Sequence, residues 1–231
     1  MKLSKDFKRI TKTYKELTEK KECSGSDEWL LDNYYIIEED AKPLLKKKLP
    51  DNCLDKARKY LLENDWKTDG IEYLADKYKM STCELRSFPD CIKVKIISKI
   101  AEICEEHNDG VKMGMLIRSL SGLRNILWED FFEKHSIADS ILSSDPYYSD
   151  MTFETKELYR NKVSHFARKY KLNEREVAEA AFNLSKNRQG RQGHVGYYLI
   201  DFGKKQLREK FGIHSKKRKN KTALYLMAIA I

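Results

Sequence analysis

The sequence predicts an all-α protein, an irregular multi-helix domain followed by the start of a transmembrane helix. Only 10 glycines and 4 prolines interrupt 231 residues, so long regular elements can form. Abundant lysine, glutamate, leucine and isoleucine favour helix over sheet. No segment shows the period-two alternation of a half-buried strand. With 41% hydrophobic and 35% charged residues, the composition is that of a folded protein and not of a disordered chain.

The first two predicted helices differ in polarity. A basic helix covers residues 2–21, with apolar residues every three or four positions. After a break, Ser26 or Asp27 is expected to cap a second helix that is apolar nearly all round and therefore buried centrally. Pro43 ends or kinks that helix. The apolar face of the first helix consists of Leu3, Phe7, Ile10, Tyr14 and Leu17.

The middle of the chain predicts two short helices and a long one. The short helices cover residues 54–64 and 71–78. Ser81 and Glu84 form a capping box, because the serine stands three residues before the glutamate. Pro89 is expected to interrupt the chain before the long helix begins. Isoleucines repeat at helical spacing along it: Ile92, Ile96, Ile100 and Ile103.

Helical patterns also fill the second half of the chain. One begins after Gly110, and a loop is expected over residues 143–146. Thr152 and Asn173 are placed to cap the next two helices. A Gly-rich loop and a last helix then follow, over residues 190–196 and 204–211.

The net charge of +9 is concentrated at the two ends. Residues 1–21 hold eight basic and three acidic side chains, and residues 216–231 hold five basic ones and no acid, so the middle is close to neutral. A nucleic-acid-binding domain usually carries positive charge on its folded body. We therefore expect no nucleic acid as a partner, and interpret the basic ends as a contact with anionic lipid or as solvated surface.

The last residues combine a basic cluster, 216–221, with an apolar run, 223–231. This run is too short to cross a bilayer, which takes about 20 apolar residues. A basic flank before an apolar helix is typical of the cytoplasmic side of a membrane, and a buried C-terminal helix is the alternative. The predicted plan is a basic helix and linker (1–26), a helical cytoplasmic domain (27–212), and a basic linker with a truncated first membrane helix (213–231).

The five cysteines indicate a reduced, cytoplasmic setting. They include no C-x-x-C pair, and no signal-like apolar stretch precedes them. Cys104 and His107 form one close pair, but Cys83 and Cys91 lack the spacing of a zinc site. We interpret the cysteines as buried thiols and expect no metal ligand.

The Gly-rich loop between Arg188 and Gly196 has two open interpretations. Its glycine amides and two arginines could cradle a phosphate. It lacks the Gly-Lys-Ser/Thr of a P-loop, and the alternative is a turn that leads into the last helix.

Four segments of the chain carry a family resemblance. They are EWLLDNYYIIEE (28–39), STCELRSFP (81–89), the stretch 136–160 that ends in MTFETKELYR, and HVGYYLI (194–200). In order and rough spacing, from Asp27 to Gly212, they resemble the N-terminal region of bacterial cyclic β-1,2-glucan synthases, which are large membrane glycosyltransferases. Thr152 and Lys156 stand where the family has Asp and Arg, and residues 42–79 match poorly.

The resemblance implies a parent enzyme with membrane helices, a cytoplasmic transfer domain that uses UDP-glucose and a divalent metal, and a phosphorylase-like domain. Within it, this chain would be a non-catalytic structural or regulatory fragment at the cytoplasmic side of the bacterial inner membrane, with the remaining domains as its partners. The alternative is a free-standing basic helical protein that binds nucleic acid or an acidic partner.

The chemistry of the residues agrees with a non-catalytic segment. Glycosyltransferases that use nucleotide sugars often need two carboxylates, as Asp-x-Asp, to hold a metal ion. The processive enzymes of this type also carry the motif Gln-x-x-Arg-Trp. The chain contains neither motif. We therefore expect no catalytic and no cofactor-binding residue. The positions that match the family motifs are Trp29, Leu31, Asp32, Asn33, Glu38, Glu84, Leu85, Asp145, Pro146, Phe153, Thr155, Tyr159, Arg160, His194, Gly196, Tyr197 and Tyr198.

Overall fold

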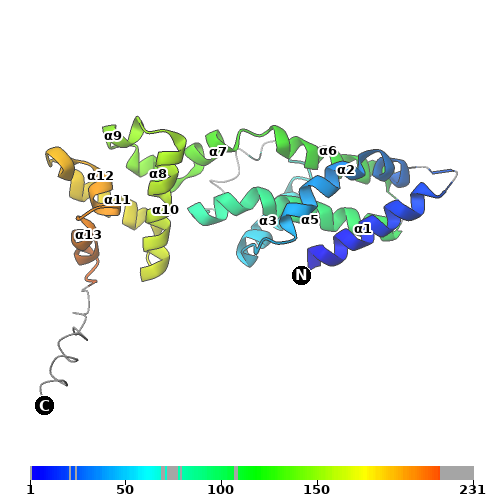
Figure 1. The fold of residues 1–231 in the computed structure, drawn as a ribbon, viewed down its shortest axis with the longest axis horizontal. Coiled ribbons are helices and arrows are strands. Elements are labelled where there is room, and N and C mark those ends of the chain that lie inside the picture. The colour runs from blue at the N-terminus through cyan, green and yellow to red at the C-terminus, as the bar shows by residue number, and fades with distance from the viewer. Residues whose placement is uncertain are drawn as a thin grey trace, which may run out of the picture. The chain divides into compact units, whose positions relative to one another are not determined.

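A computed structural model describes residues 2–20, 22–23, 25–68, 71, 78, 80–106 and 109–213. Within these ranges the chain is helical and contains no strand, which confirms the all-α prediction (Figure 1). Two compact units divide the chain, Met1–Ser140 and Ile141–Ile231, and each is described by itself.

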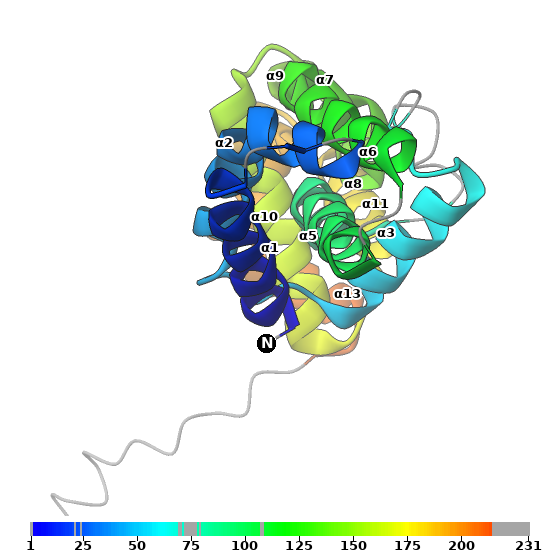
Figure 2. The ribbon, with the colours of Figure 1, turned by 90° about the vertical axis from the view of Figure 1, so that its right-hand side faces the viewer.

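Unit 1 is built around one long central helix, α5. Figure 2 shows α5 between α1, α2, α3 and α6, and α7 also contacts it. Four of its isoleucines, Ile92, Ile96, Ile97 and Ile100, have no exposed surface, so they form the centre of the core. The elements are α1 (Lys2–Thr18), α2 (Ser26–Leu44), α3 (Asp51–Glu63), α5 (Thr82–Glu106), α6 (Gly110–Gly122), η2 (Leu123–Asn125), α7 (Trp128–His135) and α8 (Ile137–Leu142), which reaches into unit 2.

The helix α5 begins as predicted but does not stop at Pro89. The Ser81 amide donates to Glu84 Oε2 at 2.8 Å, and the Glu84 amide donates to Ser81 Oγ at 3.3 Å, so the capping box is confirmed. The expected interruption at Pro89 is wrong, because the helix continues through it. Proline removes one backbone hydrogen bond, and the full burial of Phe88 and Cys91 on either side holds the helix together.

The predicted face of α1 is confirmed, and the burial expected of α2 is partly wrong. Leu3, Ile10 and Leu17 are buried where α1 contacts α5 and α2. Helix α2 has one exposed side, on which Tyr35 is 58% exposed. Its first helical residue is Ser26, and the N-cap is Gly25, with no side-chain capping bond, so the expected Ser26 or Asp27 cap is also wrong.

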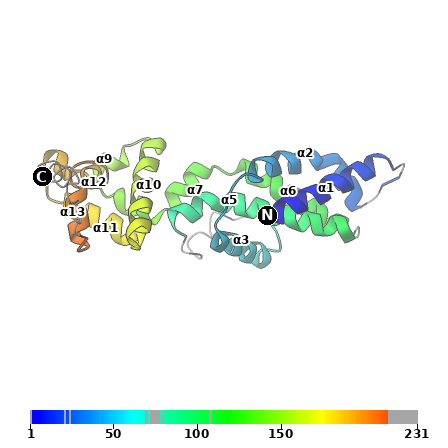
Figure 3. The same cartoon turned by 60° about the horizontal axis from the view of Figure 1, so that its bottom comes forward.

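In unit 2, α11 contacts α10, α12 and α13 (Figure 3). Both predicted caps are confirmed, since Thr152 Oγ1 accepts from the Thr155 amide, and Asn173 and Glu176 form a capping box. The expected loop at 143–146 is shorter, because Pro146 starts a helix. The elements are α9 (Pro146–Ser149), α10 (Phe153–Tyr170), α11 (Glu174–Ser185), η3 (Gly190–Gly193), α12 (Val195–Leu199) and α13 (Lys204–Lys210).

Some predictions fall outside the described residues. They are the basic cluster 216–221, the apolar run 223–231, His107, and most of the expected helix 71–78. Among the helices that are described, none combines the length and the hydropathy needed to cross a bilayer. The predicted domain plan with boundaries after residues 26 and 212 stays a prediction.

Candidate functional site

The carboxylate of Asp145 connects two segments of unit 2. It caps α9, because Oδ1 accepts from the Tyr147 amide at 2.9 Å. Its Oδ2 accepts from the Val195 amide at 2.7 Å and lies 2.8 Å from Nδ1 of His194. Asp145 is only 2% exposed, so these bonds replace water around a buried charge. The start of α9 is thereby joined to the start of α12.

The imidazole of His194 extends this network to α10. Its Nε2 lies 2.9 Å from the hydroxyl oxygen of Tyr159. Burial, and then the charge of Asp145, raises the pKa of Tyr159, so the phenol keeps its proton. A neutral ring donates through Nδ1 to Asp145 and accepts at Nε2 from Tyr159, and this tautomer satisfies both bonds. We name Asp145, His194 and Tyr159 the unit 2 triad.

Gly196 is required by close packing against the triad. A Cβ at this position would lie 2.5 Å from the Tyr159 hydroxyl and 2.7 Å from Nε2 of His194. Any side chain would therefore displace one of these groups. Tyr148 packs edge-on against Tyr159, with 5.6 Å between ring centroids, which closes another side of the network.

The other motif positions of unit 2 contribute to packing. Arg160 is 1% exposed, and its guanidinium lies 4.7 Å from the Phe153 ring centroid and donates to Glu157 at 3.2 Å. Tyr197 and Tyr198 pack ring edge to face at 5.1 Å. Pro146 is the first residue of α9, and the Thr155 amide is capped by Thr152.

Of the motif positions of α2, Trp29 packs against α6. The Trp29 ring lies against Gly114 of α6, and the Arg118 guanidinium lies 5.2 Å from its centroid. Asn33 Nδ2 donates to the Trp29 carbonyl at 3.0 Å. The remaining positions do not join this contact. Leu31 is half-buried, Asp32 is exposed, and Glu38 pairs with Lys42.

Glu84 fastens α3 to α5. Its Oε1 accepts from Asn52 at 2.6 Å and from Lys56 at 2.7 Å, while Oε2 serves the cap at Ser81. Burial on its own would raise the pKa of Glu84, but the hydrogen bonds from Lys56 and Ser81 outweigh it, and the net pKa is lowered. Leu85 beside it is buried in the core. Both motif positions of this segment therefore hold the fold together.

The Gly-rich loop does not leave its buried amide free for a phosphate. The Val195 amide already donates to the Asp145 carboxylate, an internal anion. Arg188 and Arg191 are exposed and belong to this loop. In the part of the chain that the structure describes, no group of three or more His, Cys, Asp or Glu side chains could hold a metal ion.

Some of the motif positions gather in three places. Asp145, Tyr159, His194 and Gly196 meet in the unit 2 triad and its packing, whereas Trp29 and Glu84 belong to two separate contacts of unit 1. Sequence reasoning missed that the four meet, because 49 residues separate Asp145 from His194. The available signal was the histidine at 194 with a glycine two residues later, at 196.

No protein-family model matches the chain, and no curated protein matches it either.

Proposed function

We propose that this chain is a non-catalytic, structural segment of a cyclic β-1,2-glucan synthase-like glycosyltransferase. In this proposal it stands ahead of the transfer domain on the cytoplasmic side of the bacterial inner membrane. Residues 213–231 lead into the first membrane helix, and the parent's other domains are its partners. The donor UDP-glucose and its metal bind elsewhere in the parent.

One observation carries the proposal. Four positions of the resemblance, spread over 52 residues of chain, meet in unit 2: Asp145, His194 and Tyr159 are joined by hydrogen bonds, and Gly196 packs against the last two. Residues that must touch for a fold to form are those expected to recur together in related sequences. Two of the four matching segments, 136–160 and 194–200, meet in this network, which agrees with a shared structural role for them.

The bonding of the triad supports a structural role. Both oxygens of Asp145 accept hydrogen bonds from within the unit, and the carboxylate has almost no exposed surface. Tyr159 is 8% exposed and is already bonded to His194. Side chains whose hydrogen bonds are all made within the unit serve to position helices. Here the triad fixes α9, α10 and α12 against one another. Such a rigid unit is suited to bracing a neighbouring domain.

The size of the native protein tests the proposal. An antibody raised against residues 27–212 is applied to fractionated lysate of the source cells. A very large band in the membrane fraction is expected. A soluble band near the 27.2 kDa of this chain would refute the proposal, and would bring forward the alternative of a free-standing basic binding protein.

A matched pair of variants tests the role within the parent. Asp145→Asn in the intact synthase is expected to lower the amount of assembled enzyme and of glucan. Asp150→Asn removes the same charge from an exposed position five residues on, and should leave both unchanged. Equal glucan output and equal enzyme levels in the two variants would contradict a bracing role for the triad.

A further inference from the structure

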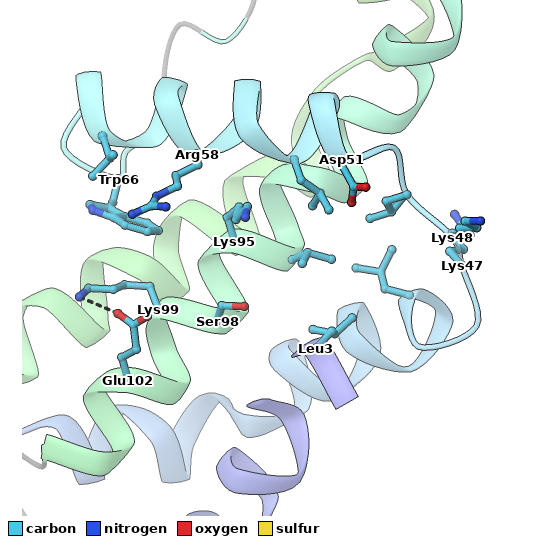
Figure 4. A pocket seen from close by; sticks show the side chains of 15 residues that line it. Leu3, Lys47, Lys48, Asp51, Arg58, Trp66, Lys95, Ser98, Lys99 and Glu102 are labelled. Atoms are coloured by element: carbon cyan, nitrogen blue, oxygen red, sulfur yellow. Dashed lines mark hydrogen bonds and ion pairs between the residues drawn. The ribbon is translucent and has the colours of Figure 1, made fainter. Parts of the chain in front are cut away.

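Unit 1 contains a cavity of 650 Å³ that the motif positions do not touch (Figure 4). Small-molecule sites usually measure about 300–1,000 Å³, so this volume suits an organic ligand. The cavity lies between α3, α5, the residues that join α2 to α3, and the start of α1. Its apolar lining consists mainly of Leu44, Leu49, Leu54, Leu62, Trp66 and Val94.

The position of Trp66 is held by an unusual turn. Asp65 and Trp66 both have positive φ, 47° and 63°, directly after the end of α3. Such backbone is uncommon for residues other than glycine and persists where the surroundings hold it in place. The Trp66 amide donates to the Leu61 carbonyl, and Asp65 pairs with Lys112 at 2.9 Å. Figure 4 shows the Trp66 ring on the same side of the cavity as Arg58.

The rim of the cavity is cationic. Five basic side chains line it, against two acidic ones, Asp51 and Glu102. Lys99 pairs with Glu102 at 3.0 Å, and Lys47 pairs with Asp90 at 2.7 Å. The other three, Lys48, Arg58 and Lys95, form no ion pair with any residue in the described ranges. Among the described residues, these three cations therefore have no anionic partner that would compete with a bound anion.

We propose that this cavity binds a soluble, single-chain anionic amphiphile, an alkyl chain that ends in a carboxylate or phosphate. The leucines and Trp66 would cover the chain, since burying apolar surface is the main source of affinity in such pockets. Arg58 and Lys95 would bind the head, and the planar guanidinium suits the paired oxygens of carboxylate and phosphate. The inference does not depend on the proposed function.

Two other occupants fit the lining less well. A nucleic acid presents successive phosphates and bases, which bind to a basic groove with several stacking aromatics, whereas this cavity has one aromatic ring and a leucine-rich wall. The chain's own C-terminal apolar run is preceded by five basic residues, which the cationic rim would repel. An apolar chain with a negative head matches both the wall and the rim.

Calorimetric titration of the full chain tests the proposal with four probes at concentrations below micelle formation. Dodecanoate and dodecyl phosphate are expected to bind saturably with one site. Dodecyltrimethylammonium has the same chain with the opposite charge, and inorganic phosphate is a head without a chain, so both should bind far more weakly. Failure of dodecanoate and dodecyl phosphate to saturate, or equal binding of the ammonium compound, would overturn the proposal.

Matched variants locate the site. Arg58→Gln with Lys95→Gln should weaken dodecanoate binding about tenfold, as expected for losing two partly exposed charge contacts. Lys12→Gln with Arg175→Gln removes the same charge from exposed positions outside the cavity and should change nothing. Thermal unfolding checks that both double variants fold. Equal loss of binding in the two, or no loss in the first, would refute the assignment to this cavity.

Discussion

The indole ring of Trp29 lies so close to Gly114 that a Cβ on this glycine would be 2.5 Å from ring atom Cε2. Helices α2 and α6 therefore touch at a point where only hydrogen fits. Gly114 sits inside α6, where glycine is otherwise less favourable than alanine by about 1 kcal/mol. The close contact explains why the helix tolerates it.

Gly114→Ala should destabilise unit 1 even though alanine is the better helix former. We expect a net loss of about 1–2 kcal/mol, because overpacking costs about 1–3 kcal/mol. Gly122→Ala, on the same helix, is the control, since its Cβ would meet Thr68 Oγ1 at an ordinary 3.5 Å. Urea unfolding of both variants measures the difference. If the Gly114→Ala variant is as stable as the Gly122→Ala variant, the contact between Trp29 and Gly114 is not tight.

Tyr159→Phe should weaken unit 2 by removing the bond to His194. The expected loss is about 1 kcal/mol or more, because the acceptor Nε2 is left unpaired. Tyr170→Phe is a matched control on the same helix, at a half-buried ring that packs on Phe166. Thermal unfolding compares the two, and equal melting temperatures would contradict the hydrogen bond.

The same variant should change the response to alkaline pH. The pKa of Tyr159 is raised in the folded state. The contribution of this phenol to stability is therefore complete below about pH 10 and decreases as pH rises through the folded pKa. Tyr78 and Tyr198 also have raised pKa values, so part of the decline will remain in the variant. Denaturant unfolding between pH 9 and 11 (roughly the range around the tyrosine pKa) should show a shallower decline for Tyr159→Phe. A parallel decline would exclude this role for the phenol.

Glu84 should contribute to stability at neutral pH and lose its contribution in acid. Its pKa in the folded state lies below the usual 4.5, so the contribution is present above pH 4.5 and disappears as pH falls through the folded pKa. Glu84→Gln should cost about 1–3 kcal/mol at pH 7, since Lys56 loses its anionic partner and one of the two acceptor oxygens becomes an NH2 donor. The variant should also show a flatter acid limb in urea unfolding. Glu102→Gln, at an exposed pair with Lys99, is the control.

Lys171→Gly should stabilise unit 2. Lys171 ends α10 with φ 56° and ψ 42°, a left-handed conformation that costs a residue with a side chain about 1–2 kcal/mol. Glycine accepts this position readily, so we expect a gain of about 0.5–1 kcal/mol. Lys169→Gly, two residues earlier inside the helix, should lose about 1 kcal/mol. Opposite shifts in melting temperature confirm the cap, and shifts of the same sign reject it.

The elements that the sequence predicts well are those with local causes. The capping boxes at Ser81 and Asn173 depend on residues three apart, so the order of residues along the chain is enough to recognise both. The apolar face of α1 follows in the same way from spacing. The starts of α5 and α11 and the buried face of α1 could thus be predicted without knowledge of the tertiary fold.

The errors have tertiary causes. Pro89 lies inside α5 because the core packing of Phe88 and Cys91 outweighs a lost hydrogen bond. Tyr35 is exposed although its helix is rich in apolar residues, because its neighbours pack against α2 from one side. Composition cannot reveal which side of a helix has a neighbour.

The candidate sites were predictable only as separate residues. Asp145, Tyr159 and His194 were each singled out by resemblance, but their joining into one network depends on how α9, α10 and α12 pack. No pattern in the sequence predicted the cavity of unit 1, since Arg58 and Lys95 come from two helices and belong to no motif.

The central position of α5 has a consequence for how unit 1 unfolds. Five helices contact it: α1, α2, α3, α6 and α7. Detachment of any of them therefore exposes part of a common row of isoleucines to water. Partial opening is therefore costly wherever it begins, and the unit should open as a whole. Amide protons in the middle of α5 will then exchange with solvent at the rate of complete opening, and a protease will encounter either an intact unit or a fully extended chain.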